Sequence, residues 1–219
     1  MFGKKSTGPD AESKEVQQLV DLQNESNIPF SIHLEQFDSN FVEINLMISS
    51  DVIKDEDNLP FFWLFCDAFT MPMNSENGVI DYETVVSSLK DDTLTFGIQR
   101  NVVFKYYPDT IKFKVKCTAD KYAKGVEWIK KAIYDSIFDE QRINVLLENF
   151  LSSIIESHRD GLNMLKSYMT DVCYNKRSLE KSSNILSNEE LLKDIKDDIE
   201  DGKFRQDILP KLEEFRNDI

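Results

Sequence analysis

The most apolar stretch of the chain, LPFFWLFCDAFTMPM, covers residues 59–73 and contains Asp67 as its single charged residue. Asn58 is a residue type that caps helix N-termini, Pro60 suits a first helical turn, and Pro72 stops a helix. A short helix that is apolar all round has to be covered on nearly every side, and this one is far too short to span a bilayer. The pattern therefore predicts a buried central helix of a soluble domain.

Three further segments, 41–49, 93–99 and 111–117, alternate apolar and polar residues as half-buried strands do. The second and third lie close together in sequence, so we expect them to pair antiparallel. The lysines of the third segment should form a solvated face that discourages edge pairing, and these are Lys112, Lys114 and Lys116. The residues expected to face the core are Val42, Ile44, Leu46, Ile48, Leu94, Phe96, Ile98, Phe113, Val115 and Cys117.

Helical periodicity dominates the rest of the chain. A short helix is expected over 82–89, ended by Asp91 and Asp92, and the chain stays helical after Asp120. Asp139 should cap a long helix, and Ser187 should open a capping box. The apolar faces expected are Val85, Val86 and Leu89; Tyr122, Val126, Ile129, Ile133 and Ile137; Ile143, Leu146, Leu147, Phe150, Leu151, Ile154 and Ile155; Leu162, Leu165, Tyr168, Met169 and Val172; Leu191, Leu192 and Ile195; and Ile208, Leu209, Leu212 and Phe215.

The order of these elements predicts an α+β fold in which helices pack on one face of an antiparallel sheet and the C-terminal half is helical. Residues 1–27 are polar and contain Gly and Pro, so we expect a linker or tail from a preceding domain. Residues 28–36 look extended, and Asn77-Gly78 marks a turn in a loop. We expect residues 28–219 to form a single domain.

The chain carries 26 basic and 40 acidic residues and has a net charge of −14. Such a surface repels nucleic-acid phosphates and anionic lipid, which argues against both as partners. A basic partner remains an alternative, although solubility alone is the simpler interpretation of this charge.

The three cysteines, Cys66, Cys117 and Cys173, lie far apart and form no CxxC motif. Each sits in an apolar pattern, so we expect buried free thiols in a reducing compartment. The chain shows neither an apolar secretory signal nor an apolar run long enough for a transmembrane helix. We expect a cytoplasmic protein, with the mitochondrial matrix as the alternative.

The two histidines do not fall in a catalytic or metal-binding motif. His33 lies in HLEQF and His158 lies at a predicted helix end, so neither H-E-x-x-H nor H-x-x-E-H occurs. A zinc site takes three or four close ligands, and a cation at a helix C-terminus is stabilising by itself. We therefore expect both histidines to have structural roles.

Other candidate chemistry is equally weak. A nucleophilic cysteine needs a nearby histidine and an electropositive, partly exposed setting, which none of the three sequence contexts predicts. The glycines form no phosphate-binding loop. An acidic run lacks the spacing and the central glycine of an EF-hand, and its members are Glu189, Glu190, Asp194, Asp197, Asp198, Glu200 and Asp201. We assign no catalytic, cofactor-binding or metal residue to this chain.

Six segments in order resemble the second domain of pitrilysin/insulinase-type zinc metallopeptidases, in the branch of presequence-protease-like proteins and their cytosolic fungal relatives. The resemblance runs from about residue 28 to the C-terminal end, and no single segment is diagnostic alone. The six segments are Leu59-Pro60, the E-x-V-V-x-x-L helix of 83–89, Asp92-Thr93, the K-Y-x-K-G segment 121–125, the F-D-x-x-R segment 138–142, and the R-D-G turn 159–161.

The resemblance implies a pitrilysin or mitochondrial-processing-peptidase-like fold and a much longer parent chain. In that family a first domain carries H-x-x-E-H and zinc, and a second domain of the same fold lacks the ligands. The second domain packs on the zinc domain and forms part of the chamber wall around unstructured peptide substrates. No catalytic residue is carried onto this chain, and zinc is expected only in the parent.

Two other functions stay open at this level. The chain could be a stand-alone acidic protein-interaction module without peptidase activity. A free-standing cysteine or histidine enzyme has almost no support in the sequence.

Overall fold

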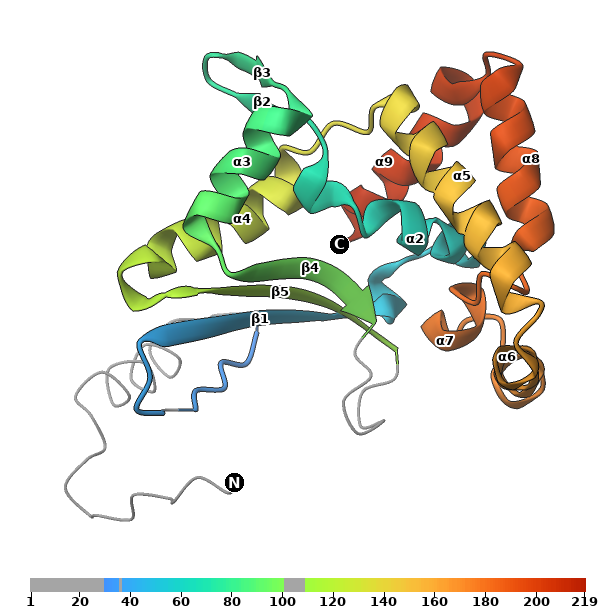
Figure 1. Ribbon diagram of the computed structural model, residues 1–219, viewed down its shortest axis with the longest axis horizontal. Coiled ribbons are helices and arrows are strands. Elements are labelled where there is room, and N and C mark those ends of the chain that lie inside the picture. The colour runs from blue at the N-terminus through green and yellow to red at the C-terminus, as the bar shows by residue number, and fades with distance from the viewer. Residues whose placement is uncertain (1–29, 36, 101–108) are drawn as a thin grey trace. The chain divides into compact units, whose positions relative to one another are not determined.

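A computed structural model describes residues 30–35, 37–100 and 109–219. Contacts divide the chain into a unit of residues 1–39 and a unit of residues 40–219. In the first unit, residues 30–35 and 37–39 contain no helix or strand, and the predicted tail of residues 1–27 lies outside the described residues. The second unit mixes helices with a small antiparallel sheet, which confirms the predicted fold class (Figure 1).

The sheet has the order β1-β5-β4, with β1 spanning Phe41–Ser49, β4 Thr95–Arg100 and β5 Thr110–Thr118. Both pairings are antiparallel, with Ile44 opposite Val115 and Ile98 opposite Phe113. The predicted pairing of the second and third strands is therefore confirmed, and the first predicted strand adds to the other side of β5. Phe113, Val115 and Cys117 are fully buried, as their alternation predicted.

The predicted solvated lysine face is wrong for Lys112, which is 9% exposed, and Lys114 and Lys116 are only half-buried. The reason is that β5 is the central strand, so neighbours flank its side chains on both sides. The Lys114 ammonium lies 3.2 Å from the Glu43 carboxylate of β1, and the Lys116 ammonium lies over the Phe41 ring. These lysines pair across the sheet and do not guard an edge.

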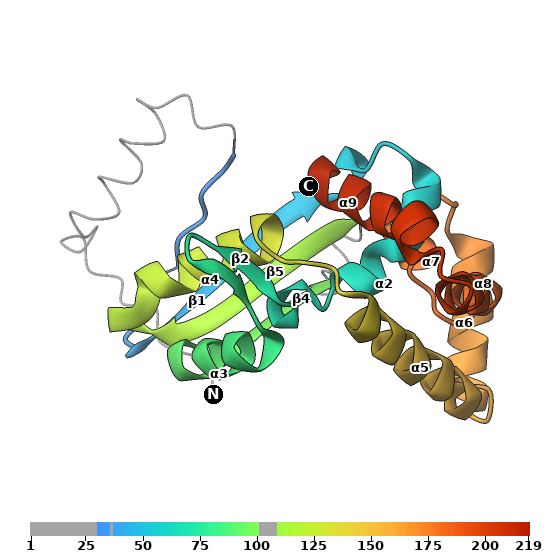
Figure 2. The same cartoon turned by 90° about the horizontal axis from the view of Figure 1, so that it is seen from above.

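Helix α4 (Tyr122–Tyr134) packs on β5 and β1, and α3 (Tyr82–Asp92) lies on the same side of the sheet (Figures 1 and 2). Gly125 permits a close approach, because an added Cβ there would lie 2.9 Å from Ile44 Cδ1 and 3.1 Å from Cys117 Sγ. The predicted stripe of α4 is confirmed for Ile129 and Ile133, which are buried, but not for its first turn. Tyr122 and Val126 are exposed, and the buried residues are Gly125, Trp128, Ile129, Ala132 and Ile133.

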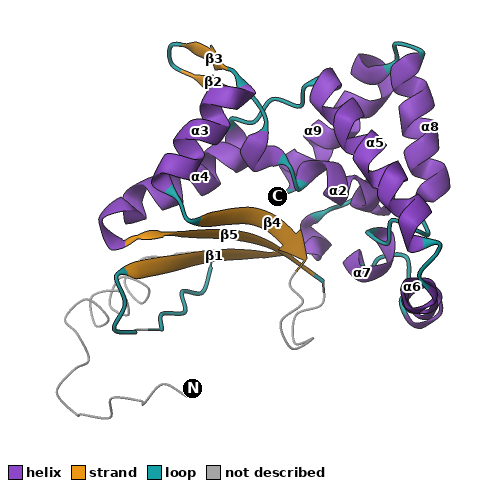
Figure 3. Ribbon diagram, in the orientation of Figure 1, coloured by secondary structure: helices purple, strands orange, loops and turns teal. Residues whose placement is uncertain are grey.

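The C-terminal half is helical, as predicted (Figure 3). Asp139 caps α5 by accepting a hydrogen bond from Arg142 N, which confirms the predicted cap. α5 packs against α8, and α9 packs against the apolar segment around α2. The helices are α5 (Glu140–Ser157), α6 (Gly161–Cys173), α7 (Leu179–Ser182), α8 (Glu189–Glu200) and α9 (Leu209–Asp218), with a π-helical turn at Phe204–Ile208 before α9.

The predicted central helix is buried but not continuous. A 3₁₀ helix spans Glu56–Phe61, α2 spans Phe62–Phe65, and a second 3₁₀ turn spans Ala68–Thr70. Asp55 caps the first segment, and Asn58 is buried inside it. Pro60 removes a donor within the first segment, and Thr70 Oγ1 donates locally to the Asp67 carbonyl, so local contacts replace a regular α-helical ladder.

Phe65 is the meeting point of the core. It is 0% exposed, and its ring centroid lies 6.1 Å from that of Phe113, 6.1 Å from that of Phe138 and 5.2 Å from that of Phe215. These rings come from β5, from the connection before α5 and from α9. One side chain therefore joins the sheet to the helical half by tilted and edge-on ring contacts.

Three local predictions need correction. The loop with Asn77-Gly78 is a hairpin of β2 (Met73–Ser75) and β3 (Gly78–Ile80), turned by Gly78 at a φ of 116°. Asp91 and Asp92 are the last two residues of α3, and Thr93 is its C-terminal cap. Ser187 forms no capping box, because its hydroxyl donates to the Asp171 carboxylate instead.

The predicted core stripe of α6 is also wrong, because α6 buries none of its thirteen residues. Its five apolar positions are 55–85% exposed: Leu162, Leu165, Tyr168, Met169 and Val172. Among the described residues, no helix is both long and apolar enough to cross a membrane.

The end of α9 is tied to the chain that follows β1. The Lys54 ammonium lies 2.6 Å from Asp218 Oδ1, and the Lys54 backbone N–H donates to Asp218 Oδ2 at 3.0 Å. The Asp218 side chain is 5% exposed, and these hydrogen bonds from Lys54 lower the pKa of its carboxyl group.

We expect Phe65→Ala to lower the free energy of unfolding by about 3–5 kcal/mol, because it leaves a cavity between three rings. Phe37 is 73% exposed, and we expect Phe37→Ala to change that free energy by about 0.5 kcal/mol or less. Urea denaturation followed by circular dichroism measures both variants. Equal losses for the two variants would contradict the central role of Phe65.

We expect the Asp218 contact to contribute about 1 kcal/mol at pH 7, a value reduced by the exposure of Lys54. Because folding lowers the pKa of Asp218, this contribution is present above the usual value of 3.8 and is lost as the pH falls through the lowered value. Asp218→Asn should therefore differ from the wild type at pH 7 and converge with it once the pH has fallen below the lowered pKa of Asp218. Asp194→Asn, at an exposed carboxylate, is the control, and a pH-independent difference for Asp218→Asn would refute the assignment.

Candidate functional site

The structure keeps the two histidines in separate structural settings. The His33 side chain is 89% exposed and lies 3.6 Å from the Glu35 carboxylate. His158 is the C-terminal cap of α5, where the sequence predicted a helix end, and its Nε2 lies 2.9 Å from Glu189 Oε2 of α8. Hydrogen bonds from Lys193 and then from His158 lower the pKa of Glu189. His158 thus links two helices and is not directed at a nucleophile.

The cysteines do not form a reactive site among the described residues. Burial raises the pKa of the Cys66 thiol and also that of the Cys117 thiol, so both are held in the protonated form that packs as a small apolar group. Cys173 lies exposed on α6, which corrects the prediction that all three thiols belong to the core. No hydrogen bond described for this chain joins a histidine to a cysteine.

The acidic run of α8 is engaged in ion pairs along its own helix and the following turn. Lys193 lies 2.6 Å from Glu189, and Lys203 lies 2.9 Å from Asp198 and 3.0 Å from Asp201. The hydrogen bonds that the Lys203 ammonium donates to these two carboxylates raise the pKa of Lys203. In the described part of the chain, no group of three or more His, Cys, Asp or Glu side chains is placed to hold a metal ion.

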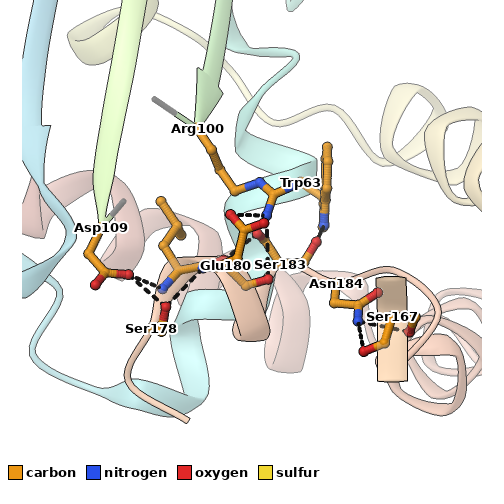
Figure 4. Close-up of polar contacts among 9 residues, drawn as sticks. Trp63, Arg100, Asp109, Ser167, Ser178, Glu180, Ser183 and Asn184 are labelled. Carbon is orange, nitrogen blue, oxygen red and sulfur yellow. Dashed lines mark hydrogen bonds and ion pairs between the residues drawn. The ribbon is translucent and has the colours of Figure 1, made fainter. Parts of the chain in front are cut away.

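The most connected polar arrangement lies at residues 178–184, which we call the α7 joint (Figure 4). Asp109 directly precedes β5. Its Oδ1 accepts hydrogen bonds from Ser178 Oγ at 2.8 Å and from Leu179 N at 2.9 Å. Ser178 Oγ in turn caps α7 by accepting from Glu180 N. The short helix is therefore anchored to the sheet at its first turn.

A second contact in the α7 joint comes from β4. The Arg100 guanidinium lies 2.7 Å from the Glu180 carboxylate and 5.7 Å from the centre of the Trp63 ring. Trp63 Nε1 donates to the carbonyl of Ser183. Both members of the ion pair are less than one-third exposed, so solvent screens this contact only partly. The joint thereby binds β4, α7 and the central apolar segment into one network (Figure 4).

The α7 joint also reaches α6. Asn184 Nδ2 donates to Ser167 Oγ at 2.9 Å, and Lys181 Nζ donates to the Asp171 carbonyl at 2.7 Å. Sequence reasoning missed α7, because four helical residues are too few to show a period. The signal available was Ser178 directly before Leu179 and Glu180, a capping residue at a helix start.

A groove of about 700 Å³ opens beside the α7 joint. Its lining includes the basic residues Lys176 and Lys211 and the acidic residues Glu56 and Asp57. The half-buried side chains of Pro60 and Leu191 supply its apolar surface. Two lining atoms, Ser182 Oγ and Asp171 Oδ1, are buried without a hydrogen-bond partner in the described structure. Among the described residues that line it, the groove brings together no acid–base pair aimed at a nucleophile.

Comparisons with known proteins place this chain beside two yeast proteins. No family model matches the chain. An uncharacterized protein of Saccharomyces cerevisiae is 40% identical over 199 residues, which cover 88% of this chain and 19% of that protein. An uncharacterized protein of Schizosaccharomyces pombe is 27% identical over 213 residues, which cover 93% of this chain and 20% of that protein. The chain thus spans about a fifth of the length of the curated relatives it matches.

We expect Asp109→Ala to lower the free energy of unfolding by about 1–2 kcal/mol, because two donors of the α7 joint lose their acceptor. Asp109→Asn is the matched control, since its amide oxygen still accepts a hydrogen bond, and it should cost less than half as much. Chemical denaturation measures both variants. A full loss in Asp109→Asn would mean that the charge, and not the hydrogen bonds, holds the joint.

Proposed function

We propose that the chain is a non-catalytic structural domain of a larger zinc metalloendopeptidase of the pitrilysin type, which degrades unstructured peptides. The observation that carries the proposal is that the polar side chains are engaged in hydrogen bonds and ion pairs within the domain. The side chains that could take part in catalysis form contacts within the domain instead. His158 contacts Glu189, Arg100 pairs with Glu180, and Asp109 accepts a hydrogen bond from Ser178. Such a chain supports a neighbouring site and does not supply one.

The length of the relatives supports the same proposal. This chain aligns over 88% and 93% of its residues with proteins about five times as long. Residues 40–219 form one unit of sheet and helices, and similar sequence occurs within much longer chains. Both properties are expected of a domain. The resemblance of the six sequence segments then suggests which kind of longer chain this is.

In this proposal the domain packs on the zinc-bearing domain of the same polypeptide and forms part of the wall of a peptide-sized chamber. Zinc belongs to the neighbouring domain, and this chain contributes no ligand to it. The partners are other domains of the parent and its peptide substrate, with neither nucleic acid nor membrane among them. The cytoplasm is the proposed compartment, with the mitochondrial matrix as the alternative.

A stand-alone acidic interaction module is the second candidate. The net charge of −14 and the exposed apolar face of α6 favour it, because both suit a surface that meets another protein. The two candidates differ in whether zinc and peptidase activity accompany the domain in its full-length polypeptide.

The deciding experiment compares this chain with the full-length polypeptide for zinc content and for cleavage of a quenched, unstructured peptide. We expect the full-length form to hold about one zinc per chain and to lose cleavage on treatment with a chelator. This chain alone should do neither.

Three results would overturn the proposal. Stoichiometric zinc in this chain alone would mean that it contains a metal site. Absence of zinc and cleavage from the full-length form would favour the interaction module. An activity of this chain that disappears in Cys66→Ser or His158→Ala would instead indicate a free-standing enzyme.

A further inference from the structure

Helix α6 is amphipathic, but its apolar side is turned away from its own domain. We call Leu162, Leu165, Tyr168, Met169 and Val172 the α6 outward face, and these side chains are 55–85% exposed. Their spacing of three and four residues places them along one stripe of the helix. A surface helix of a globular protein normally buries such a stripe, so this orientation requires an explanation.

The side of α6 that meets the domain is largely polar. Ser167 Oγ accepts from Asn184 Nδ2 at 2.9 Å, and the Asp171 carboxylate accepts from Ser187 Oγ at 2.8 Å. Asp171 also offers its carbonyl to Lys181 Nζ. Thirteen residues are thus held to the α7 joint by hydrogen bonds, with no buried apolar side chain.

The same contacts fix the rotation of α6 about its axis. Asp160 caps the helix by accepting from Leu162 N at 2.8 Å and from Asn163 N at 3.3 Å. Turning the apolar stripe inward would break the bonds of Ser167 and Asp171 and would place both polar groups toward solvent. The hydrogen bonds of Ser167 and Asp171 therefore favour the outward orientation of the stripe.

The low charge of α6 indicates which class of partner its apolar stripe would bind. The helix contains only two charged residues, Lys166 and Asp171, and the latter is bound on the inner side. A nearly uncharged apolar stripe on a chain of net charge −14 suits an apolar protein face and not an anionic lipid surface.

We propose that the α6 outward face is a docking surface, buried against an apolar face of another domain of the same polypeptide in its full-length form. The inference rests on the proposed function only in placing this chain within a longer polypeptide, as the relatives indicate. It does not depend on zinc or on peptidase chemistry.

The size of the face argues for a tethered partner over a second copy of the chain. A stable interface between free proteins uses about 20–30 residues on each side, whereas this face has five side chains on one helix. A partner in the same polypeptide is present at an effective concentration of about millimolar, so a smaller contact is sufficient.

Cys173, at the end of α6, provides a native reporter. It is the exposed cysteine of the three, whereas Cys66 is half-buried and Cys117 is buried. In this chain alone, a maleimide should modify Cys173 first, as read by peptide mass spectrometry. In the full-length polypeptide we expect Cys173 to react at least about tenfold more slowly, because a docked domain covers α6.

The variant that tests the face is the double substitution Leu165→Lys/Met169→Lys. We expect the midpoint of thermal unfolding of this chain to stay within about 2 °C of the wild type, because neither side chain is buried. In the full-length polypeptide the same variant should restore fast labelling of Cys173. Lys166→Glu, on the same helix but outside the stripe, should leave labelling slow and is the matched control.

Each alternative has its own result. Equal labelling rates in the two wild-type forms would overturn the proposal. A concentration-dependent dimer of this chain that Leu165→Lys/Met169→Lys abolishes would assign the face to a second copy. A large loss of stability in the isolated double variant would show that the stripe packs within its own domain. Protected Cys173 in a full-length form without zinc would sustain this inference and refute the proposed peptidase.

Discussion

The contact of Phe65 with Phe113, Phe138 and Phe215 is the interaction on which the rest of the domain depends. It lies where the sheet, the connection into α5 and the final helix converge, so the two halves of the domain share one apolar centre. The interrupted backbone around it is a consequence, because covering so many aromatic side chains from several directions favours short turns over one straight helix. The core is therefore organised by side-chain packing more than by regular secondary structure.

The α7 joint complements this centre with polar contacts. Asp109 and Arg100 extend from the sheet to α7, and Trp63 reaches the same place from the apolar segment. From there Asn184 and Lys181 hold α6 by its polar side. An apolar centre fixes the halves of the domain, and a polar joint presents one amphipathic helix with its apolar side free.

Much of the fold could be predicted because period and capping are local properties. The alternation of 111–117 identified a buried strand, and Asp139 identified the start of α5. The site was harder to predict, since α7 is shorter than any recognisable period. The sequence correctly predicted which apolar residues share one face of α6. Periodicity does not state what covers that face. Whether their own domain or another protein covers that side depends on tertiary contacts such as those of Asp171.

The contact between Phe65 and Phe215 also has a consequence for synthesis of the chain. The two residues are 150 positions apart, so the ribosome makes Phe215 roughly 8–30 s after Phe65 at about 5–20 residues per second. During that interval the apolar segment around Phe65 lacks one of its walls. We therefore expect this unit to complete its core only after α9 has been synthesised, and until then the apolar surface around Phe65 stays exposed and prone to aggregation.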